Sequence, residues 1–386
     1  MNFHLTEEQE MLRAMTRAFA EGEIAPIAHQ IDETEVIPDD LRRKLRENNY
    51  FGLLIPEEYG GAGVDCVSYA LILEELSRAS AAVAITISVH NSVAAGPIQM
   101  FGTDEQKRKW LPLLAGKQLG AFALTESGSG SDAAALTTSA VRDGNRYVLN
   151  GSKTFVTNGK FADLFLLMAR TSPGQKHRGI SSFLVERDAP GLRIGKAIAK
   201  MGIRGSDTVE LFLEDCSVPC TNRLSEEGRG FKVAMQSLDG GRIGVAAQAL
   251  GIAQAALDAA ARYARERVQF GRPIAEFQAI QWMVADSRCE IEGARLLTLR
   301  AAWLKDQGIP HGPEAAIAKL TASAVARRVT DRAVQIHGGY GYTKEFAVER
   351  YYRDAKVTEL YEGTSEIQRI VIANSVLHRK DGQGTA

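Results

Sequence analysis

The sequence carries almost no net charge, and this excludes partners that bind through overall electrostatics. Lysine and arginine together number 46 and aspartate and glutamate 47, so the formal net charge is -1. Proteins that hold nucleic acid or an anionic membrane through bulk charge are strongly basic. We therefore expect neither of these partners.

Cysteine is also scarce, and the few cysteines form no metal-binding pattern. The four are Cys66, Cys216, Cys220 and Cys289. The pair in CSVPC has no second pair and no nearby histidine cluster at the spacing of zinc ligands. We expect no metal site, and thiols that stay reduced in the cytosol.

Signals for export or membrane insertion are missing as well. The first residues, MNFHLTEEQEML, are acidic and contain neither the basic nor the apolar region of a secretory signal. The most apolar helical stretch, around 245–261, is interrupted by Gln and Asp. We expect no membrane span and a cytoplasmic location, with a mature form in the mitochondrial matrix as the alternative.

The first part of the chain has the pattern of a helical domain. With 386 residues the chain is too long for one ordinary core, so several domains are expected. Thr6 and Gln9 form a capping box ahead of an apolar helical period, and further helices begin at Asp39 and Thr103. Residues 1–120 are therefore predicted to be helical.

The pattern changes at about residue 121. From there to about 220, short apolar runs alternate with glycine and aspartate, and Asp143 with Gly144 marks a hairpin turn. No helix-length segment separates these runs, which favours a β-domain of sheet or barrel type over βαβ units.

The helical period returns after Gly230. We expect long helices over 231–272, 275–307 and 313–337, which far exceed ordinary surface helices and must pack along one another as a bundle. The predicted fold is mainly α with a central β-domain, divided into an N-terminal helical domain over 1–120, the β-domain over 121–230 and a C-terminal helical bundle over 231–386.

Two segments carry the residue types of a cofactor site. FALTESGSGSD, at 122–132, alternates serine and glycine, which exposes backbone N–H groups and small donors to an oxyanion or a phosphate. In GSKTFVTNGKFAD, at 151–163, Phe155 and Thr157 lie on one face of a strand, as a flat conjugated cofactor would use them. A flexible surface loop and a strand face packed on the core are the alternatives.

Glycines interrupt two helical patterns. In VQIHGGYGYTKEF, at 334–346, more glycines follow the helix than a C-cap needs, so we expect a ligand or another subunit to approach Gly338 and Gly339 closely. His337 has no partner at triad or metal spacing and is expected to be structural.

The second interruption lies in SLDGGRIGVAA, at 237–247. Gly240 and Gly241 are unfavourable inside a helix, which indicates close packing or a ligand. Asp239 and Arg242, three residues apart, share a face, and a plain surface ion pair is the alternative for them.

Near the C-terminus, YEGTSEIQR places a carboxylate where a helix dipole does not explain it. Glu366 lies in the first turn of a helix, where negative charge is favourable, and Thr364 is a reasonable N-cap. Glu362 lies between Tyr361 and Gly363, outside that turn. Taken alone it would be an exposed loop acid.

Together with other segments in the same order, these motifs resemble the acyl-CoA dehydrogenase family. The matching motifs cover nearly the whole chain: EEYGGAG, LTESGSGSD, KTFVTNG, MGIRGSDT, FLEDCSVP, ERVQFGRPIAEFQ, QIHGGYGYTKEF, RYYRDAK and YEGTSEIQR. The likeness is closest to the short-chain, butyryl-type members. It implies a helical domain, a β-barrel-like domain and a C-terminal four-helix bundle, with non-covalent FAD between them and a homotetramer built as a dimer of dimers.

The resemblance also assigns residues to two sites. It implies that FAD contacts Phe122, Leu124, Thr125, Ser131, Phe155, Thr157, Thr364 and Glu366, and, across a dimer interface, Arg267, Phe270, Gln278, Gln335, Gly338 and Gly339. It implies that the acyl-CoA substrate contacts Ser131, Asp239, Arg242, Tyr361 and Gly363.

By the same resemblance, Glu362 is the base that removes the α-proton of an acyl thioester. The thioester carbonyl would be bound by the backbone N–H of Glu362 and a ribityl hydroxyl of FAD, and the β-hydrogen would leave as hydride to flavin N5, giving a trans-2-enoyl-CoA. Some members place the base at the position of Gly241, which cannot serve here. Glutaryl-type members carry an arginine in the segment matched by 88–97, and this segment has none.

The resemblance implies that electron-transferring flavoprotein reoxidises the reduced cofactor, with Glu214 as a weak candidate for docking it. An acyl-CoA oxidase or a flavin monooxygenase on the same fold is the alternative activity. A non-catalytic CoA-binding or flavin-binding scaffold is a further alternative, and Glu362 speaks against it.

Overall fold

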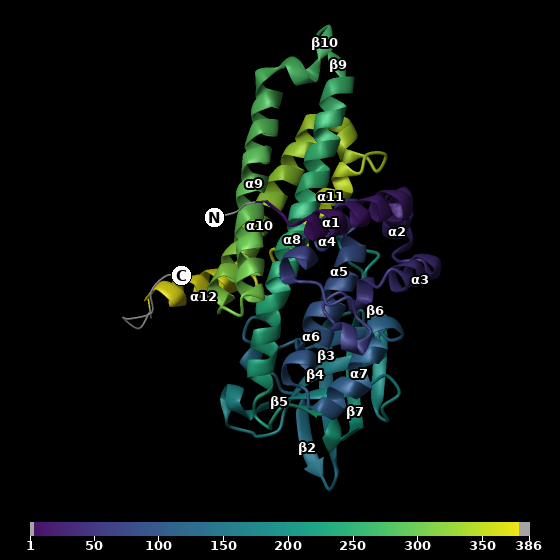
Figure 1. The fold of residues 1–386 in the computed structure, drawn as a ribbon, viewed down its shortest axis with the longest axis vertical. Coiled ribbons are helices and arrows are strands. Elements are labelled where there is room, and N and C mark those ends of the chain that lie inside the picture. The colour runs from purple at the N-terminus through teal and green to yellow at the C-terminus, as the bar shows by residue number, and fades with distance from the viewer. Residues whose placement is uncertain (1–3, 378–386) are drawn as a thin grey trace.

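A computed structural model describes residues 4–377. The molecule is elongated, with the sheet at one end of its long axis and a small hairpin at the other (Figure 1). The longest helix, α8, runs between these ends, and the N-terminal helices pack against its middle (Figure 1). The predicted fold class, helical at both ends of the chain with a β-domain between, is confirmed.

The N-terminal helices begin where the sequence predicts. The side chain of Thr6 accepts a hydrogen bond from the N–H of Gln9 and completes a capping box, and Thr103 does the same with Gln106. The elements are α1 Glu7–Phe19, η1 Ala20–Ile24, η2 Ala25–Ile27, α2 Ala28–Thr34, α3 Asp39–Glu47, η3 Tyr50–Gly52, η4 Glu57–Tyr59, α4 Cys66–Ala79, α5 Ala81–Ser88, η5 Val89–Ala95, α6 Gly96–Phe101 and α7 Asp104–Gly116.

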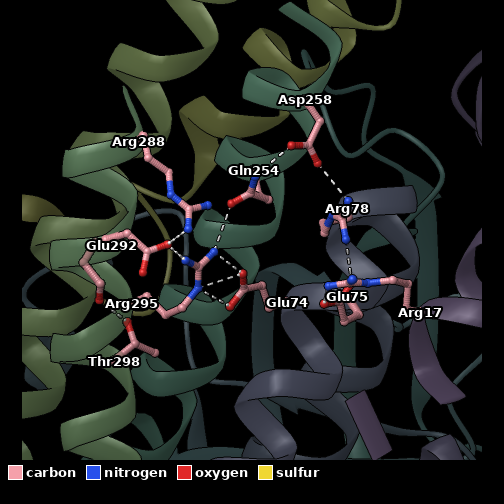
Figure 2. A network of polar contacts seen from close by, with 11 residues as sticks. Arg17, Glu74, Glu75, Arg78, Gln254, Asp258, Arg288, Glu292, Arg295 and Thr298 are labelled. Atoms are coloured by element: carbon pink, nitrogen blue, oxygen red, sulfur yellow. Dashed lines mark hydrogen bonds and ion pairs between the residues drawn. The ribbon is translucent and has the colours of Figure 1, made fainter. Parts of the chain in front are cut away.

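Helix α4 is buried on nearly all sides, although it carries two acids. Arg295 of α9 donates to Glu74 at 2.7 Å, and Arg17 of α1 donates to Glu75 at 2.6 Å (Figure 2). A buried charge is costly unless it is paired and hydrogen-bonded. These pairs therefore tie α1 and α9 to α4.

The β-domain is one sheet. Its strands are β1 Gly120–Ala123, β2 Ser139–Asp143, β3 Arg146–Thr157, β4 Leu164–Arg170, β5 Ile180–Glu186, β6 Leu192–Ala197, β7 Thr208–Pro219 and β8 Arg223–Leu224, and the short helices η6 Ala133–Ala135, η7 Lys176–Gly179 and η8 Cys220–Asn222 join them. The strand order is β6-β7-β3-β2-β4-β5-β8, with β1 parallel to β4. Within residues 4–377 its ends do not pair, so the sheet is open. The predicted hairpin turn is confirmed, because Asp143 pairs with Arg146.

The C-terminal helices pack along one another, and α10 contacts α8, α9, α11 and α12. The elements are α8 Gly230–Glu266, β9 Val268–Gln269, β10 Arg272–Pro273, η9 Ile274–Glu276, α9 Gln278–Asp306, α10 Gly312–His337, η10 Gly338–Tyr342, α11 Val348–Val357 and α12 Ser365–Leu377.

One predicted boundary is wrong. The first long helix was expected to reach residue 272 but ends at Glu266. The chain then forms the hairpin of β9 and β10, whose turn residues Phe270 and Gly271 have φ angles of 53° and 78°. Left-handed backbone at consecutive residues is typical of a tight hairpin turn and cannot continue a helix.

By length and hydropathy, two helical stretches could cross a membrane: Ala81–Phe101 and Gly230–Glu266. Inside the protein, however, 94% and 83% of their most apolar windows are buried. These stretches have the environment of core helices.

Candidate active site

Glu362 lies in a left-handed turn just before α12. The φ angle of Glu362 is 53° and that of Gly363 is 95°. Residues other than glycine rarely adopt a positive φ. Thr364 accepts a hydrogen bond from the N–H of Ile367 at 3.4 Å, which confirms it as the helix cap. Strained backbone of this kind persists only where the surroundings hold it.

The carboxylate of Glu362 is buried without a hydrogen-bond partner. Neither Oε1 nor Oε2 is accessible to solvent, and neither has a partner among the described residues. Burial raises the pKa of Glu362 to about 7, against the opposing attraction of Lys319 and Arg242. The expectation of an exposed loop acid, drawn from the motif alone, is therefore wrong.

Gly241 makes room for that carboxylate. A Cβ atom added to Gly241 would lie 2.1 Å from Oε2 of Glu362 and 3.2 Å from Val93. Any larger residue would displace the acid, which explains the glycine inside α8. At Gly240 an added Cβ would meet only the flexible end of Lys305, at 2.9 Å.

Arg242 and Asp239 form an ion pair, but not at the surface. Arg242 is 4% exposed, and its Nη1 donates to Asp239 at 2.6 Å. Burial raises the pKa of Asp239, opposed by Arg242. The Nε of Arg242 is buried without a partner in the described part of the chain, so part of the guanidinium is left for another group.

Two buried side chains that sequence reasoning missed hold the turn at Glu362. The Nζ of Lys319, on α10, donates to the carbonyl of Gly363 at 2.7 Å. The side-chain amide of Gln368, on α12, donates to the carbonyls of Glu362 and Gly363 at 3.2 and 2.8 Å. The available signal for Lys319 was a single charged residue in the otherwise uncharged helical run AAIAKLTASA, which indicates a buried lysine.

Tyr361 and Gln248 close one side of the site. The hydroxyl of Tyr361 donates to the Oε1 of Gln248, and the side-chain amide of Gln248 donates to the carbonyl of Ala81 at 2.9 Å. Gln248 is fully buried in α8. The contact fixes the Tyr361 ring, which precedes Glu362 in the chain.

The two predicted cofactor segments run side by side. The N–H of Thr154 donates to the carbonyl of Thr125 at 2.8 Å, and β1 and β3 contact each other. A register shift between Lys153 and Val156, with φ of 55° at Phe155, interrupts the regular alternation that the sequence predicts for this strand. The ring of Phe155 is 64% exposed.

An ion pair that sequence reasoning missed fixes these segments together. Lys153 donates to Glu126 at 2.7 Å and to the carbonyl of Leu124 at 3.1 Å. Glu126 also accepts from both N–H and hydroxyl of Thr137 and from the N–H of Thr138, at 2.7 to 2.9 Å. Both charged residues stand in segments that the sequence marks, but their spacing does not show that they pair.

These residues fit a flat cofactor with polar groups. An exposed aromatic ring at Phe155 offers a stacking surface. The side-chain hydroxyls of Thr125, Ser131 and Thr157 make no hydrogen bond within residues 4–377, so they remain free as donors. Phe122 is half-buried beside them in β1.

The segment η5 links the cofactor segments to Glu362. The N–H of Gly120, at the start of β1, donates to His90 of η5 at 2.8 Å. Val93 of η5 lies next to Gly241 and the Glu362 carboxylate. The strand that carries Phe122 and the helix that carries Gly241 therefore pack on the same short element.

A second group of predicted cofactor residues gathers at the far end of the helical bundle. A cavity of 790 Å³ there is lined by Arg267, Phe270, Gly338 and Gly339. Phe270 is 93% exposed. Gln278 and Gln335 are exposed near this end.

His337, at the same end, has the structural role predicted for it. Its ring stacks on Tyr263 with 4.2 Å between centroids, and its Nδ1 bonds to the carbonyl of Ala333.

The two groups of predicted cofactor residues lie far apart in one chain. Gly241 of α8 lies near the first group, and Arg267 of the second group follows the end of the same helix. Along the helix axis, Gly241 and Arg267 are about 40 Å apart at 1.5 Å per residue. In Figure 1 the hairpin of β9 and β10 lies at the opposite end of α8 from the sheet. A single chain cannot bring both groups to one ligand.

The other residues marked by the sequence are surface residues. Ser131 and Glu366 are exposed. Glu214 is exposed and lies 3.5 Å from Arg193. Within residues 4–377 no cluster of histidine, cysteine and acidic side chains could hold a metal ion, and the cysteines are free.

Models of three domains of one protein family match the chain. Residues 6–118 match the acyl-CoA dehydrogenase N-terminal domain, 121–216 the middle domain and 228–377 the C-terminal domain. Together they cover most of the sequence.

Individual proteins match over their whole length. A protein of Clostridium acetobutylicum named acyl-CoA dehydrogenase, short-chain specific, is 50% identical over 97% of this chain and 100% of its own. The structure of butyryl-CoA dehydrogenase from Megasphaera elsdenii has a TM-score of 0.96 and 47% identity, and covers 98% of this chain and 100% of its own. A structure from work on the electron transferring flavoprotein of Acidaminococcus fermentans has a TM-score of 0.97 and 51% identity, with the same coverage.

Proposed function

The chain belongs to the acyl-CoA dehydrogenase family, and on this premise we propose that it dehydrogenates a short-chain acyl-CoA to the trans-2-enoyl-CoA. Members of the family are FAD-dependent oxidoreductases, and FAD is the cofactor. Bound FAD supplies the acceptor for the hydride that leaves the β-carbon. The protein must supply the base for the α-proton and the groups that hold the thioester.

The unpaired, buried carboxylate of Glu362 is the observation that carries the proposal. A general base works best when its pKa lies near the operating pH. Burial raises the pKa of Glu362 to about 7, from 4.5. In most buried carboxylates hydrogen bonds would lower it again. Here both oxygens are left free of partners among the described residues, so Glu362 can accept a proton from carbon.

The same turn supplies a donor for the thioester oxygen. The backbone N–H of Glu362 donates to no acceptor within residues 4–377. In the reaction, negative charge develops on the thioester carbonyl as the α-proton leaves, and a fixed N–H donor stabilises that charge. Base and donor therefore come from one residue, held in place by the left-handed backbone.

Arg242 and Asp239 are proposed to face the substrate. The free Nε of Arg242 can donate to a polar group of the acyl-CoA, while Asp239 holds the other end of the guanidinium. Ser131 and Gly363 are proposed as further substrate contacts. Leu124, Thr125, Phe155, Thr157, Thr364 and Glu366 remain the proposed contacts of FAD on this side, with Phe122.

The closed side of the site is proposed to limit the length of the acyl chain. Tyr361 is anchored to Gln248, which is in turn anchored to the carbonyl of Ala81, so the three form a fixed wall beside the base. An acyl chain that reached this wall would have to break buried hydrogen bonds, which is costly. The substrate with the highest rate is expected to be a short-chain acyl-CoA, in keeping with the short-chain specific relative, and an assay over longer and branched acyl-CoAs tests this.

A second copy of the chain is proposed to complete each cofactor site. Arg267, Phe270, Gln278, Gln335, Gly338 and Gly339 would contact the FAD held mainly by the partner. The separation of about 40 Å within one chain supports this, because it keeps the two groups of one chain from contacting the same part of a ligand. We propose a homotetramer built as a dimer of dimers, located in the cytoplasm, with domains over 1–120, 121–230 and 231–386.

Electron-transferring flavoprotein is the proposed electron acceptor, with Glu214 as a docking residue. The alternative is an acyl-CoA oxidase or flavin monooxygenase, in which oxygen reoxidises the flavin. Purified enzyme, yellow with FAD, should lose its flavin absorbance when mixed anaerobically with butyryl-CoA. Stopped-flow mixing of the reduced enzyme with air separates the two activities: slow reoxidation favours the dehydrogenase, and fast formation of peroxide would exclude it.

A further inference from the structure

We propose that Lys319 is a positioning residue for the base, whose ammonium group holds the turn at Gly363 and favours the ionised form of Glu362. The inference rests on the proposed function, in which Glu362 removes the α-proton. Nothing in the motif YEGTSEIQR points to Lys319, which lies more than forty positions earlier, on α10.

Lys319 is buried without a carboxylate partner. It is 0% exposed, and its Nζ donates to the carbonyl of Gly363 at 2.7 Å. No ion pair of Lys319 occurs within 4.0 Å in the described part of the chain. A buried ammonium group with one neutral acceptor is expensive, and such a group normally shifts its pKa or finds a counter-charge.

The counter-charge is the equally unpaired carboxylate next to that carbonyl. Glu362 precedes Gly363 in the chain, so the ammonium group and the carboxylate are held at one turn without touching. Their attraction acts in a site that both side chains share away from solvent, where Coulomb energies exceed those in water. Direct contact would occupy the oxygens that must receive a proton.

The other charged groups around Glu362 do not replace Lys319. Arg242, from α8, is already neutralised by Asp239 at 2.6 Å. Tyr361 and, from α4, Tyr69 are neutral phenols whose hydroxyls bond to Gln248 and Ser88, and burial raises the pKa of both.

The pKa directions agree with this geometry. Burial raises the pKa of Glu362, and of the attractions that oppose it Lys319 contributes more than Arg242. Burial also lowers the pKa of Lys319 to about 8, opposed first by Glu362 and then, with weaker effects, by Glu359 and Glu366. At neutral pH the ammonium group of Lys319 therefore favours the ionised form of Glu362, and the carboxylate of Glu362 favours the protonated form of Lys319.

The test replaces Lys319 by Met, which keeps the length of the stem but removes the charge. The second-order rate constant for anaerobic flavin reduction by butyryl-CoA is measured from pH 5.5 to 9. An opposite charge nearby typically lowers the pKa of a carboxylate by about 1 to 3 units. For Lys319→Met we expect the acid limb of the profile to move up by about one unit, with roughly tenfold slower reduction at pH 6.5 and recovery toward pH 9.

A direct readout does not use activity. The carboxyl band of Glu362, identified as the infrared band missing from Glu362→Gln, is titrated in the substrate-free holoenzyme. The midpoint of this titration should move to higher pH by the same amount in Lys319→Met. Lys319→Arg keeps the charge, so its infrared titration midpoint and the acid limb of its pH profile should lie close to those of the parent enzyme. Lys109, on α7, is an exposed lysine whose Nζ lies 3.2 Å from Glu186, and it serves as the control. Lys109→Met should leave the infrared titration and the pH profile unchanged.

Failure of this inference differs from failure of the proposed function. A purely structural lysine would lower the rate equally at every pH, so an unmoved limb and band in folded, FAD-loaded Lys319→Met overturn the inference. If that variant does not fold, Lys319→Gln, which keeps a donor without charge, is judged by the same criterion. Undiminished reduction by Glu362→Gln would instead overturn the proposed function, whatever Lys319 does.

Discussion

Glu126 and Glu362 both have a buried carboxylate with a buried lysine nearby, yet their environments shift the carboxylate pKa in opposite directions. Lys153, Thr137 and Thr138 donate to Glu126. Burial by itself would raise the pKa of Glu126, but the attraction of Lys153 and these hydrogen bonds outweigh it and lower the pKa to about 2. Glu362 has no donor within residues 4–377, and burial raises its pKa to about 7.

The difference separates a structural carboxylate from the one that we propose to be reactive. Buried polar groups in proteins are almost always hydrogen-bonded, so an unpaired one needs an explanation. Glu126 stays charged at neutral pH and joins the two predicted cofactor segments. Glu362 is held between its charged and neutral forms, which is what a proton acceptor requires.

The largest effect is expected from removing the carboxylate of Glu362. Glu362→Gln should retain FAD and bind butyryl-CoA, because the amide fits the same space. A positioned base contributes about 10²- to 10⁴-fold, so the rate of anaerobic flavin reduction should fall by at least that factor. Stopped-flow absorbance measures it, with FAD content and acyl-CoA affinity as controls. Reduction at the parent rate would mean that another residue is the base.

The corresponding change at Glu126 should affect stability instead. Glu126→Gln leaves the ammonium group of Lys153 buried beside an amide, and breaking a buried ion pair from one side costs about 3–5 kcal/mol. Chemical denaturation at fixed protein concentration should show this loss. The double variant Glu126→Gln/Lys153→Met should recover part of it. A fully stable single variant would contradict the role assigned to the pair.

Gly241→Ala tests whether the space for the Glu362 carboxylate is essential. The new methyl group would overlap Oε2 and displace the acid, and a shift of about 1 Å in a reacting group can cost roughly 10²-fold in rate. Gly240→Ala is the matched control, since its methyl group meets only the mobile end of Lys305. We expect flavin reduction to drop in the first variant and to stay near the parent rate in the second. Equal rates would show that the glycine is not required.

The smallest effect is a gain in stability from Glu362→Gln. The pKa of Glu362 is raised from 4.5 to about 7, so this carboxyl takes up a proton on folding and lowers stability as the pH rises between those values. Above about pH 7 the penalty is constant. Glutamine at position 362 removes this penalty, so the free energy of unfolding should rise by up to about 3 kcal/mol at pH 8. Little change is expected at pH 4.5. A loss of stability at pH 8 would argue that the carboxylate is satisfied after all.

The helical and β regions could be predicted from the sequence because their signals are local. Capping boxes at Thr6 and Thr103 and the turn at Asp143 act within a few residues, and each was confirmed. The end of α8 was missed, since a helical period continues through ERVQ and only the Phe270–Gly271 turn breaks it.

The site was harder to predict, because it depends on contacts between distant segments. The motif around Glu362 raised a question about that residue, but its burial comes from Gly241 and Val93 on other elements. Lys153 and Lys319 were not assigned any role. Their partners lie 27 and 44 positions away, and only the packing of strands and helices brings them together.

The most direct test of the central claim is the pH dependence of the second-order rate constant for anaerobic flavin reduction by butyryl-CoA at low concentration, which reports the ionisation of the free enzyme. If Glu362 is an unpaired buried base, the rate should rise about tenfold per pH unit at acid pH and level off near pH 7. A rate that is constant from pH 5.5 to 8.5 would mean that the base titrates like a solvated or hydrogen-bonded carboxylate, and would contradict the account.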